Sequence, residues 1–252
     1  DWMNAMTTRP NGGQYSGRGL GNDAHKPLWT PELIAKFYSG ITTAHGIFFK
    51  NMQLTDFARL IICESMQEST GDPKLGVTGK ISWDDHTSHG IIQVTPASVL
   101  KDYFDYGMDI TDSSGKVMLS PKTIQSVDLS DPGLSVIVWA WYTSNSVKAG
   151  VSLNEYGHKD EWHPQLGKVT RDFGNCMLEW LAGPHNDRHG NGKSAFDDYY
   201  KRILDYAVQS KFYTKEQFDQ LLNTKIEGNL ILVKGGSGTV SSFPGNATTP
   251  RS

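Results

Sequence analysis

The chain has 252 residues, of which 37% are hydrophobic, and it carries a formal net charge of -3 at pH 7. That length allows one domain with a sizeable core, or such a domain with small appendages. The slight acidic excess argues against nucleic acid as the main partner, because proteins that bind it normally present a basic patch. The longest apolar run, residues 136–141, is far too short to span a membrane, so we expect no membrane partner.

The composition divides the chain into three regions. Residues 1–29 are rich in Gly, Asn and Pro without periodicity, which indicates an irregular N-terminal arm. Residues 30–226 have helical spacing and form the expected domain. Residues 227–252 contain a strand-like run at 230–233 followed by Gly, Ser, Thr and Pro, which indicates a flexible C-terminal tail.

Signals for helix starts recur along the domain and predict a mainly α fold. Thr30-Pro31 places a capping hydroxyl before a proline that suits the first helical position. The segment from Thr214 to Gln217 has the pattern of a capping box. Helices are expected over residues 30–43, from 54 to about 71, from starts at 95, 120 and 131, and over 169–182, 196–209 and 214–222.

Three features favour a secreted, extracellular protein. The chain begins at Asp1 without a Met, as a processed secretory protein would, although trimming gives the same start. Its two cysteines suit one disulfide in an oxidising compartment. The sequence Asn246-Ala247-Thr248 is a glycosylation sequon in a tail that is expected to be exposed.

The helix that begins near residue 54 carries two glutamates beside its apolar stripe. Steps of three and four residues from Phe57 lead along that stripe to Glu64 and Glu68, which lie one turn apart. Burial, a like charge and the negative end of the helix dipole should raise the pKa of Glu68 towards the range of a general acid. From the helix alone, two ordinary solvated glutamates are an equally good interpretation.

Segments on both sides of a polar insert resemble one known family. Glu68-Ser69 followed by Asp72-Pro73 is similar to the Glu-Ser-x-x-Asn-Pro signature of goose-type lysozymes and lytic transglycosylases. Residues 90–98 resemble that family's Gly-Leu-Met-Gln-x-x-Pro-x-Thr signature. Residues 131–142 resemble the helix that precedes the family's Ala-Tyr-Asn-Ala-Gly-Pro motif, and Ala182-Gly183-Pro184 matches the end of that motif. Tyr200 lies where the family has its late Tyr-x-x-Arg-Val helix, so the similarity covers about residues 54–206.

The resemblance implies a lysozyme-like helical fold with a cleft for a β-1,4-linked amino-sugar polymer, either peptidoglycan or a chitin-like polymer. It implies Glu68 as the catalytic acid. We expect no cofactor, and a monomer. The chain departs from the family at Trp180 and Leu181, where the family has tyrosine and asparagine. The substrate-binding residues that the resemblance suggests are Ser69, Gly90, Gln93, Tyr142, Trp180 and Tyr200.

The insert before Gly90 supplies two candidates for a catalytic base, Asp84 and Asp85. Goose-type lysozymes have an aspartate six residues before the equivalent glycine, and that spacing falls on Asp84; a second aspartate of those lysozymes is replaced by Thr95. An inverting hydrolase needs a second carboxylate to activate water, so the resemblance gives Asp84 this role with Asp85 as the alternative. Without the family, both aspartates fit a polar turn anchored by Trp83 equally well.

Two other functions remain open at the level of sequence. A lytic transglycosylase would use Glu68 alone and would not need the aspartates. The altered Trp180-Leu181 motif is also compatible with a glycan-binding protein that lost turnover.

The remaining histidine and cysteine residues give weaker expectations. The segments 86–89 and 185–189 contain histidines but no His-Glu-x-x-His helix or cysteine cluster, so we expect no metal. In the family, the helices that would contain Cys63 and Cys176 lie near the cleft, so a disulfide between them would brace the active site. The alternative is two unpaired buried thiols.

Overall fold

The computed structural model describes residues 29–79, 81–149, 172–183 and 186–226, and these residues are mainly helical, as predicted. The predicted arm, except Trp29, and the tail with its strand-like run lie outside the described residues. The elements in chain order are α2 (Pro31–Phe48), α3 (Leu54–Ser69), a π-helical turn (Pro96–Leu100), α4 (Lys101–Tyr106), β1 (Ile110–Thr111), β2 (Val117–Leu119), a 3-10 turn (Ile124–Ser126), α5 (Pro132–Ala149), α6 (Phe173–Ala182), α7 (Lys193–Gln209) and α8 (Lys215–Leu222).

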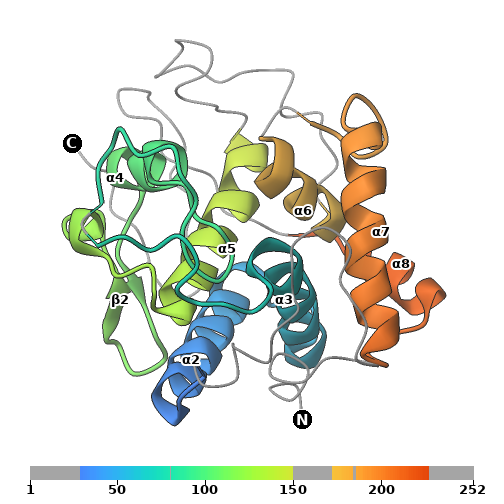
Figure 1. The fold of residues 1–252 in the computed structure, drawn as a ribbon, viewed down its shortest axis with the longest axis horizontal. Coiled ribbons are helices and arrows are strands. Elements are labelled where there is room, and N and C mark those ends of the chain that lie inside the picture. Colours follow the sequence, from blue (N-terminus) through green and yellow to red (C-terminus); the bar gives the residue numbers. More distant parts are fainter. Residues whose placement is uncertain (1–28, 80, 150–171, 184–185, 227–252) are drawn as a thin grey trace.

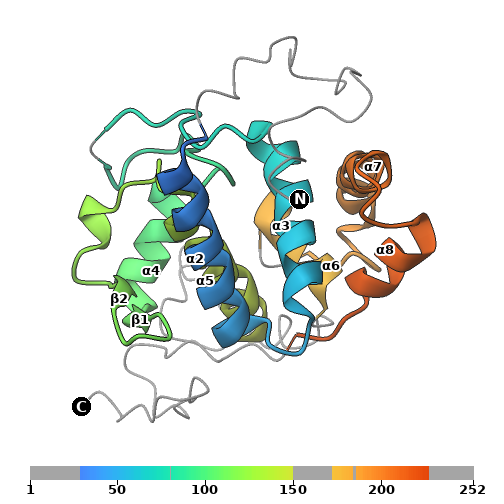
Figure 2. The ribbon, with the colours of Figure 1, turned by 90° about the horizontal axis from the view of Figure 1, so that it is seen from below.

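Helix α3 lies in the middle of the helical assembly. Figure 1 shows α2 and α5 on one side of it and α7 with α8 on the other. In the perpendicular view of Figure 2, α2 runs alongside α5, with which it packs extensively. Helix α6 packs against α5, α7 and α8. The carboxylates of α3 are therefore surrounded by helices from distant parts of the sequence.

The close packing of α2 on α5 depends on two glycines. A Cβ atom at Gly40 would lie 2.2 Å from the Cα atom of Gly133, far inside any real contact distance. Neither position therefore accommodates a side chain without moving one helix.

Aromatic rings fasten α3, α5 and α6 together in the core. The ring of Phe49 stacks on Phe57 of α3 with centroids 4.8 Å apart, and on Trp139 of α5 at 5.5 Å. Phe173 at the start of α6 meets Phe49 edge-on at 5.7 Å. All four side chains are fully buried, so they contribute both apolar area and ring contacts to the core.

Several predicted helix starts are confirmed by their caps. The Thr30 hydroxyl accepts a hydrogen bond from Leu33 N at 3.2 Å, and α2 begins at Pro31. Asp131 Oδ1 accepts from the backbone amide of Gly133 at 2.8 Å at the start of α5. Thr214 and Gln217 form the predicted reciprocal capping box of α8. These ends follow from local chemistry, which is why the sequence predicts them.

Other boundaries differ from the prediction. Helix α2 continues to Phe48 rather than ending near Thr43, because Ala44 and Phe48 extend its buried face. Helix α6 begins at Phe173, where the side chain of Asp172 caps it, and the predicted first residues from 169 to 171 lie outside the described part. Helix α7 begins at Lys193, three residues before the predicted start.

The predicted helix after Ser120-Pro121 is wrong. Ser120 donates its hydroxyl to Asp109 at 2.5 Å and accepts from Lys122 N at 3.3 Å, and only a 3-10 turn follows. Ser120 instead closes the unpredicted antiparallel hairpin of β1 and β2. The turn of that hairpin is fixed by Asp112, whose Oδ1 accepts from Ser114 N at 2.8 Å.

The predicted disulfide is not formed. Neither Cys63 nor Cys176 forms a disulfide, and both are fully buried in the hydrophobic core. Cys63 lies on α3, whereas the thiol of Cys176 on α6 faces the carbonyl of Thr143 on α5 at 3.6 Å. Burial raises the pKa of the Cys63 thiol, which keeps it protonated. Both residues therefore act as small core side chains.

Among the described residues, no helix has the length and apolarity that a membrane span requires.

Candidate functional site

Glu68 occupies the last turn of α3. The helix ends because Thr70 adopts a left-handed conformation, with φ of 64°, and the glycine that follows it also has a positive φ. This ending leaves the Glu68 side chain only partly buried. The hydroxyl of Tyr199, on α7, lies 2.5 Å from Glu68 Oε1 and donates to it. The carboxylate predicted to carry the chemistry is thus held by a phenol from a distant helix.

Glu64 lies one turn earlier and is fully buried. Its Oε1 atom accepts a hydrogen bond from Trp139 Nε1 at 3.1 Å and lies 3.3 Å from the hydroxyl oxygen of Tyr199. Burial and the nearby charge of Glu68 raise the pKa of Glu64 well above its ordinary value. Burial and the two carboxylates likewise raise the pKa of Tyr199. Burial thus favours the neutral form of both the Glu64 carboxyl group and the Tyr199 phenol.

Ser69 connects the end of α3 to the segment around Gly90. Its hydroxyl donates to the backbone oxygen of Ile91 at 2.6 Å and also contacts Ser65 O, at 3.1 Å. Gly90 has a φ of 76°, and a Cβ atom there would lie 2.3 Å from the backbone oxygen of Leu129. The turn from His89 to Val94 closes with a pair of backbone hydrogen bonds. Ser69 and Gly90 thus have clear structural roles beside Glu68.

Gln93 points its amide back at its own turn. It has a φ of 58°, and its Nε2 atom donates to Gly90 O at 2.9 Å and contacts Leu75 O at 3.4 Å. The side chain therefore stabilises the turn conformation. Its amide is engaged by the backbone in this structure.

Trp180 lies against the same turn, and Tyr142 contacts Trp180. The indole Nε1 of Trp180 donates to the backbone oxygen of Ile92 at 2.8 Å. The ring of Tyr142 meets the Trp180 ring edge-on, with centroids 5.8 Å apart. Trp180 is partly buried, and Tyr142 nearly completely. The α5 and α6 residues singled out in the sequence are thus brought next to the turn that Ser69 ties to α3.

Asp84 and Asp85 differ sharply in their surroundings. Asp85 accepts hydrogen bonds from the Thr87 amide and hydroxyl, at 2.8 and 2.5 Å, and its Oδ2 atom lies 2.7 Å from Nε2 of the buried His89. These contacts, led by the Thr87 hydroxyl, lower the pKa of Asp85 to about 2. Asp84 is exposed, and its carboxylate has no hydrogen-bond partner among the described residues. Asp85 is therefore committed to shaping the loop, and Asp84 is the more accessible carboxylate.

Tyr200 does not lie with the other predicted site residues. Its hydroxyl donates to Asp219 Oδ1 of α8 at 2.5 Å. The neighbouring Tyr199 is the residue that reaches Glu68, and the resemblance to the lysozyme family did not indicate it. The spacing along α7 contains the signal, since Tyr199 shares the buried stripe with Phe196 and Ile203, whereas Tyr200 lies beside that stripe.

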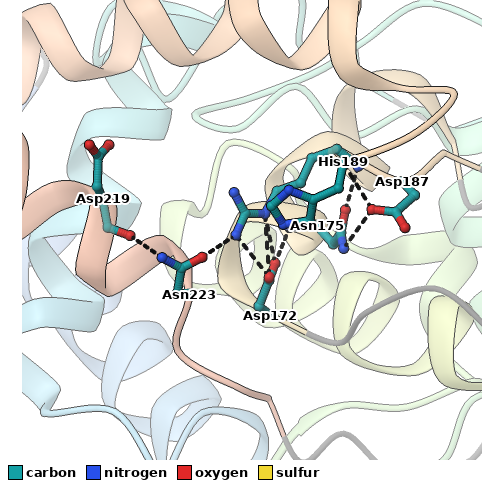
Figure 3. Close-up of polar contacts among 7 residues, drawn as sticks. Asp172, Asn175, Asp187, His189, Asp219 and Asn223 are labelled. Carbon is teal, nitrogen blue, oxygen red and sulfur yellow. Dashed lines mark hydrogen bonds and ion pairs between the residues drawn. The ribbon is translucent and has the colours of Figure 1, made fainter.

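A buried ion pair holds the segment that follows α6. Arg188 Nη2 lies 2.9 Å from Asp172 Oδ2, and both side chains are at least nine-tenths buried. Figure 3 shows Asp172, Asn175 and Asn223 converging on this network from α6 and from the end of α8. The network fixes residues 186–192 against α6. Only the polar character of this loop could be read from the sequence.

The histidine segments are only partly described by the structure. In the part of the chain that the structure describes, no three His, Cys, Asp or Glu side chains are grouped to hold a metal ion. His89 is buried against Asp85, and the position of His185 lies outside the described residues. The carboxylate pair on α3 is accordingly the strongest candidate for chemistry in the described part.

Comparison with known proteins adds no relative: no family model matches the chain, and neither curated proteins nor solved structures gave a match. The candidate site therefore stands on its own geometry. That geometry combines a partly exposed carboxyl group, a fully buried one a single turn away, and a phenol that touches both. Such a set suits proton transfer to or from a bound molecule.

Proposed function

We propose that the protein is a lysozyme-like glycoside hydrolase that acts outside the cell on β-1,4 links of peptidoglycan or a chitin-like polymer. Glu68 is the acid that protonates the leaving oxygen, and Asp84 is the base that activates water for inversion. The proposal combines the resemblance of the segments around Glu68 and Gly90 with the contacts of these segments.

The observation that carries the proposal is the hydrogen bond from Tyr199 to Glu68, together with the partial exposure of Glu68 and its buried neighbour. Glu68 is partly exposed and within one turn of a buried acid, and its helix end is tied through Ser69 to the turn at Ile91. A general acid needs a carboxyl group that is oriented, partly removed from water and still able to reach a substrate. Glu68 meets these requirements better than any exposed surface glutamate of the chain.

The choice of Asp84 as base rests on the contrast with its neighbour. The carboxylate of Asp85 accepts two hydrogen bonds from Thr87 and pairs with His89, and its pKa of about 2 makes it a weak base. Asp84 has an exposed carboxylate on the same loop. We therefore retain Asp84 for activation of water and assign Asp85 to the loop.

Trp180 is the best candidate for contact with a sugar ring. Its Nε1 atom is used by Ile92 O, so a sugar would meet the aromatic surface and not the polar atom. Aromatic faces stack well on pyranose rings, and the edge of Tyr142 holds the indole in place. The tryptophan at this position would then replace the family's tyrosine in a stacking role.

Digestion of purified peptidoglycan and of chitin oligomers, with anomer-resolved product analysis, tests the proposal. We expect the wild type to release products whose new reducing ends have the inverted anomeric configuration. The hydrolytic activity of Glu68→Gln should be lower by about 100-fold or more, the usual range for a missing general acid. Glu216→Gln, a change at an exposed glutamate of α8, is the matched control. Full activity of Glu68→Gln would refute the role of Glu68.

The product and a second variant separate hydrolysis from its alternatives. Asp84→Asn should strongly reduce hydrolysis, whereas Asp205→Asn, at an exposed aspartate of α7, should not. A 1,6-anhydro product would identify a lytic transglycosylase that uses Glu68 alone. Binding of the polymer without any product, unchanged in Glu68→Gln, would identify a glycan-binding protein.

A further inference from the structure

The hydroxyl of Tyr199 lies between two carboxyl groups but has only one hydrogen to donate. Glu68 Oε1 is the nearer acceptor at 2.5 Å, and Glu64 Oε1 is 3.3 Å away. Helices α3 and α7, which carry these three residues, pack against each other (Figures 1 and 2). If both carboxyl groups were ionised, one of these two contacts would set two acceptors against each other. A proton on one carboxyl group removes that conflict.

Among the described residues, no cation compensates a negative charge on Glu64. Its side chain is completely buried, Trp139 on α5 donates to it, and the shared phenol on α7 lies 3.3 Å away. Its Oε2 atom has no hydrogen-bond partner in the described part of the chain, and the charge that acts on Glu64 there is the like charge of Glu68. The adjacent Cys63 is a neutral thiol. An unpaired buried carboxylate is costly, so the proton belongs on Glu64 in the unliganded protein.

Glu68 differs from Glu64 in its access to water. Glu68 is partly exposed, so solvent stabilises its ionised form in the unliganded protein. A polymer that covers Glu68 would remove this water and make its charge more costly. The preference for the proton would then shift from Glu64 towards Glu68, although no atom of the substrate touches Glu64.

We propose that Glu64 is a positioning residue that stores the proton for Glu68, and that Tyr199 passes this proton between the two carboxyl groups. The inference rests on the proposed function of Glu68. In the transfer, the hydrogen of Glu64 Oε1 moves to the Tyr199 oxygen while the Tyr199 hydrogen moves to Glu68 Oε1. The phenol is neutral before and after the step, and the negative charge moves from Glu68 to Glu64.

Titration of the glutamate carboxyl carbons by NMR tests the proton store without any substrate. The chain has eight glutamates, so few signals need to be assigned through single variants. We expect Glu64 to remain protonated at pH 7 in the wild type. Because Glu64 loses its proton beside an ionised Glu68, Glu68→Gln should lower the titration midpoint of Glu64. A Glu64 signal that titrates near pH 4.5, or a Glu64 midpoint that is unchanged in Glu68→Gln, would overturn the proposal.

The pH profile of Glu64→Gln then tests the link to turnover. Glutamine keeps the shape of the side chain and its acceptor for Trp139 but holds no transferable proton. The alkaline limb of the plot of kcat/KM against pH should shift to lower pH by about one unit. On that limb kcat/KM should therefore fall about tenfold at a given pH, whereas kcat/KM at acid pH should change little. A merely structural role would leave the shape of the profile unaltered, and this outcome would refute the store.

The two measurements distinguish the failure of this inference from the failure of the proposed function. If neither glycan is cleaved by the wild type, the proposed function fails, while the coupled titration still decides where the proton lies. If the wild type is active and the two carboxyl groups titrate independently, only the inference fails. Should Glu64→Gln not fold, the midpoint of Glu64 in Glu68→Gln remains decisive.

Discussion

The hydroxyl of Tyr199 lies 2.5 Å from Glu68 Oε1, although 131 positions separate these two residues in the chain. The same hydroxyl contacts Glu64, so one phenol from α7 connects both carboxyl groups of α3. The candidate chemistry of the protein depends on this packing of two helices.

Removal of the Tyr199 hydroxyl should destabilise the protein. Tyr199→Phe leaves Glu64 with Trp139 as its remaining donor in a fully buried position, and such a loss costs about 1–3 kcal/mol. Tyr200→Phe is the matched control, because its hydroxyl pairs with the partly exposed Asp219. Urea unfolding of both variants measures the difference. Equal losses of stability would contradict the special position of Tyr199.

Gly90→Ala should disturb the turn next to Glu68. The left-handed φ of 76° costs a non-glycine residue about 1–2 kcal/mol, and the added Cβ atom meets Leu129 O at 2.3 Å. Gly46→Ala on α2 is the control and should not destabilise the protein, because nothing lies within 4 Å of its Cβ position and alanine is the better helix former. Thermal unfolding should show a lower Tm for the first variant and an unchanged or higher Tm for the second.

The Arg188–Asp172 pair should matter more than the surface ion pairs. Arg188→Met leaves the buried carboxylate of Asp172 without its cation, and such a change typically lowers the free energy of unfolding by about 3–5 kcal/mol. Lys193→Met breaks the exposed pair with Asp197, for which about 1 kcal/mol or less is expected. Denaturant unfolding provides both values. A similar loss of stability for both variants would show that the buried ion pair stabilises the protein no more than the exposed pair.

Asp85 should make the protein sensitive to acid. Its folded-state pKa of about 2 lies below the ordinary value of 3.8, so its contacts with Thr87 stabilise the folded state above that ordinary value. This contribution is lost as the pH falls from about 4 towards 2. Asp85→Asn should therefore be less stable than the wild type at pH 5.5, and the gap should narrow at pH 3. A gap that stays constant over this range would contradict the assignment.

The two cysteines should behave as buried thiols. Cys63 and Cys176 are both buried and unbonded, so a thiol reagent should label neither in the native protein and both after unfolding in guanidinium. Dithiothreitol should leave the Tm unchanged. A Tm that falls on reduction would restore the disulfide that the sequence had suggested.

The candidate site could be predicted only in part. The helical stripe correctly places Glu64 and Glu68 on neighbouring turns of α3, because the period of a helix is a local property. It did not identify which glutamate is buried or which tyrosine meets them. Gln93 is a predicted substrate-binding residue, and in the structure its side-chain amide donates to its own turn, where the backbone of Gln93 is left-handed.

The mainly helical fold and several helix ends could be predicted from the order of residues, since caps such as Thr30 and Thr214 act within one turn of chain. Three features could not be predicted in this way: Tyr199 rather than Tyr200 meets Glu68, Cys63 and Cys176 form no disulfide, and Arg188 is buried on Asp172. These contacts depend on how whole helices pack. The order of residues along the chain sets the faces of each helix but not which faces meet.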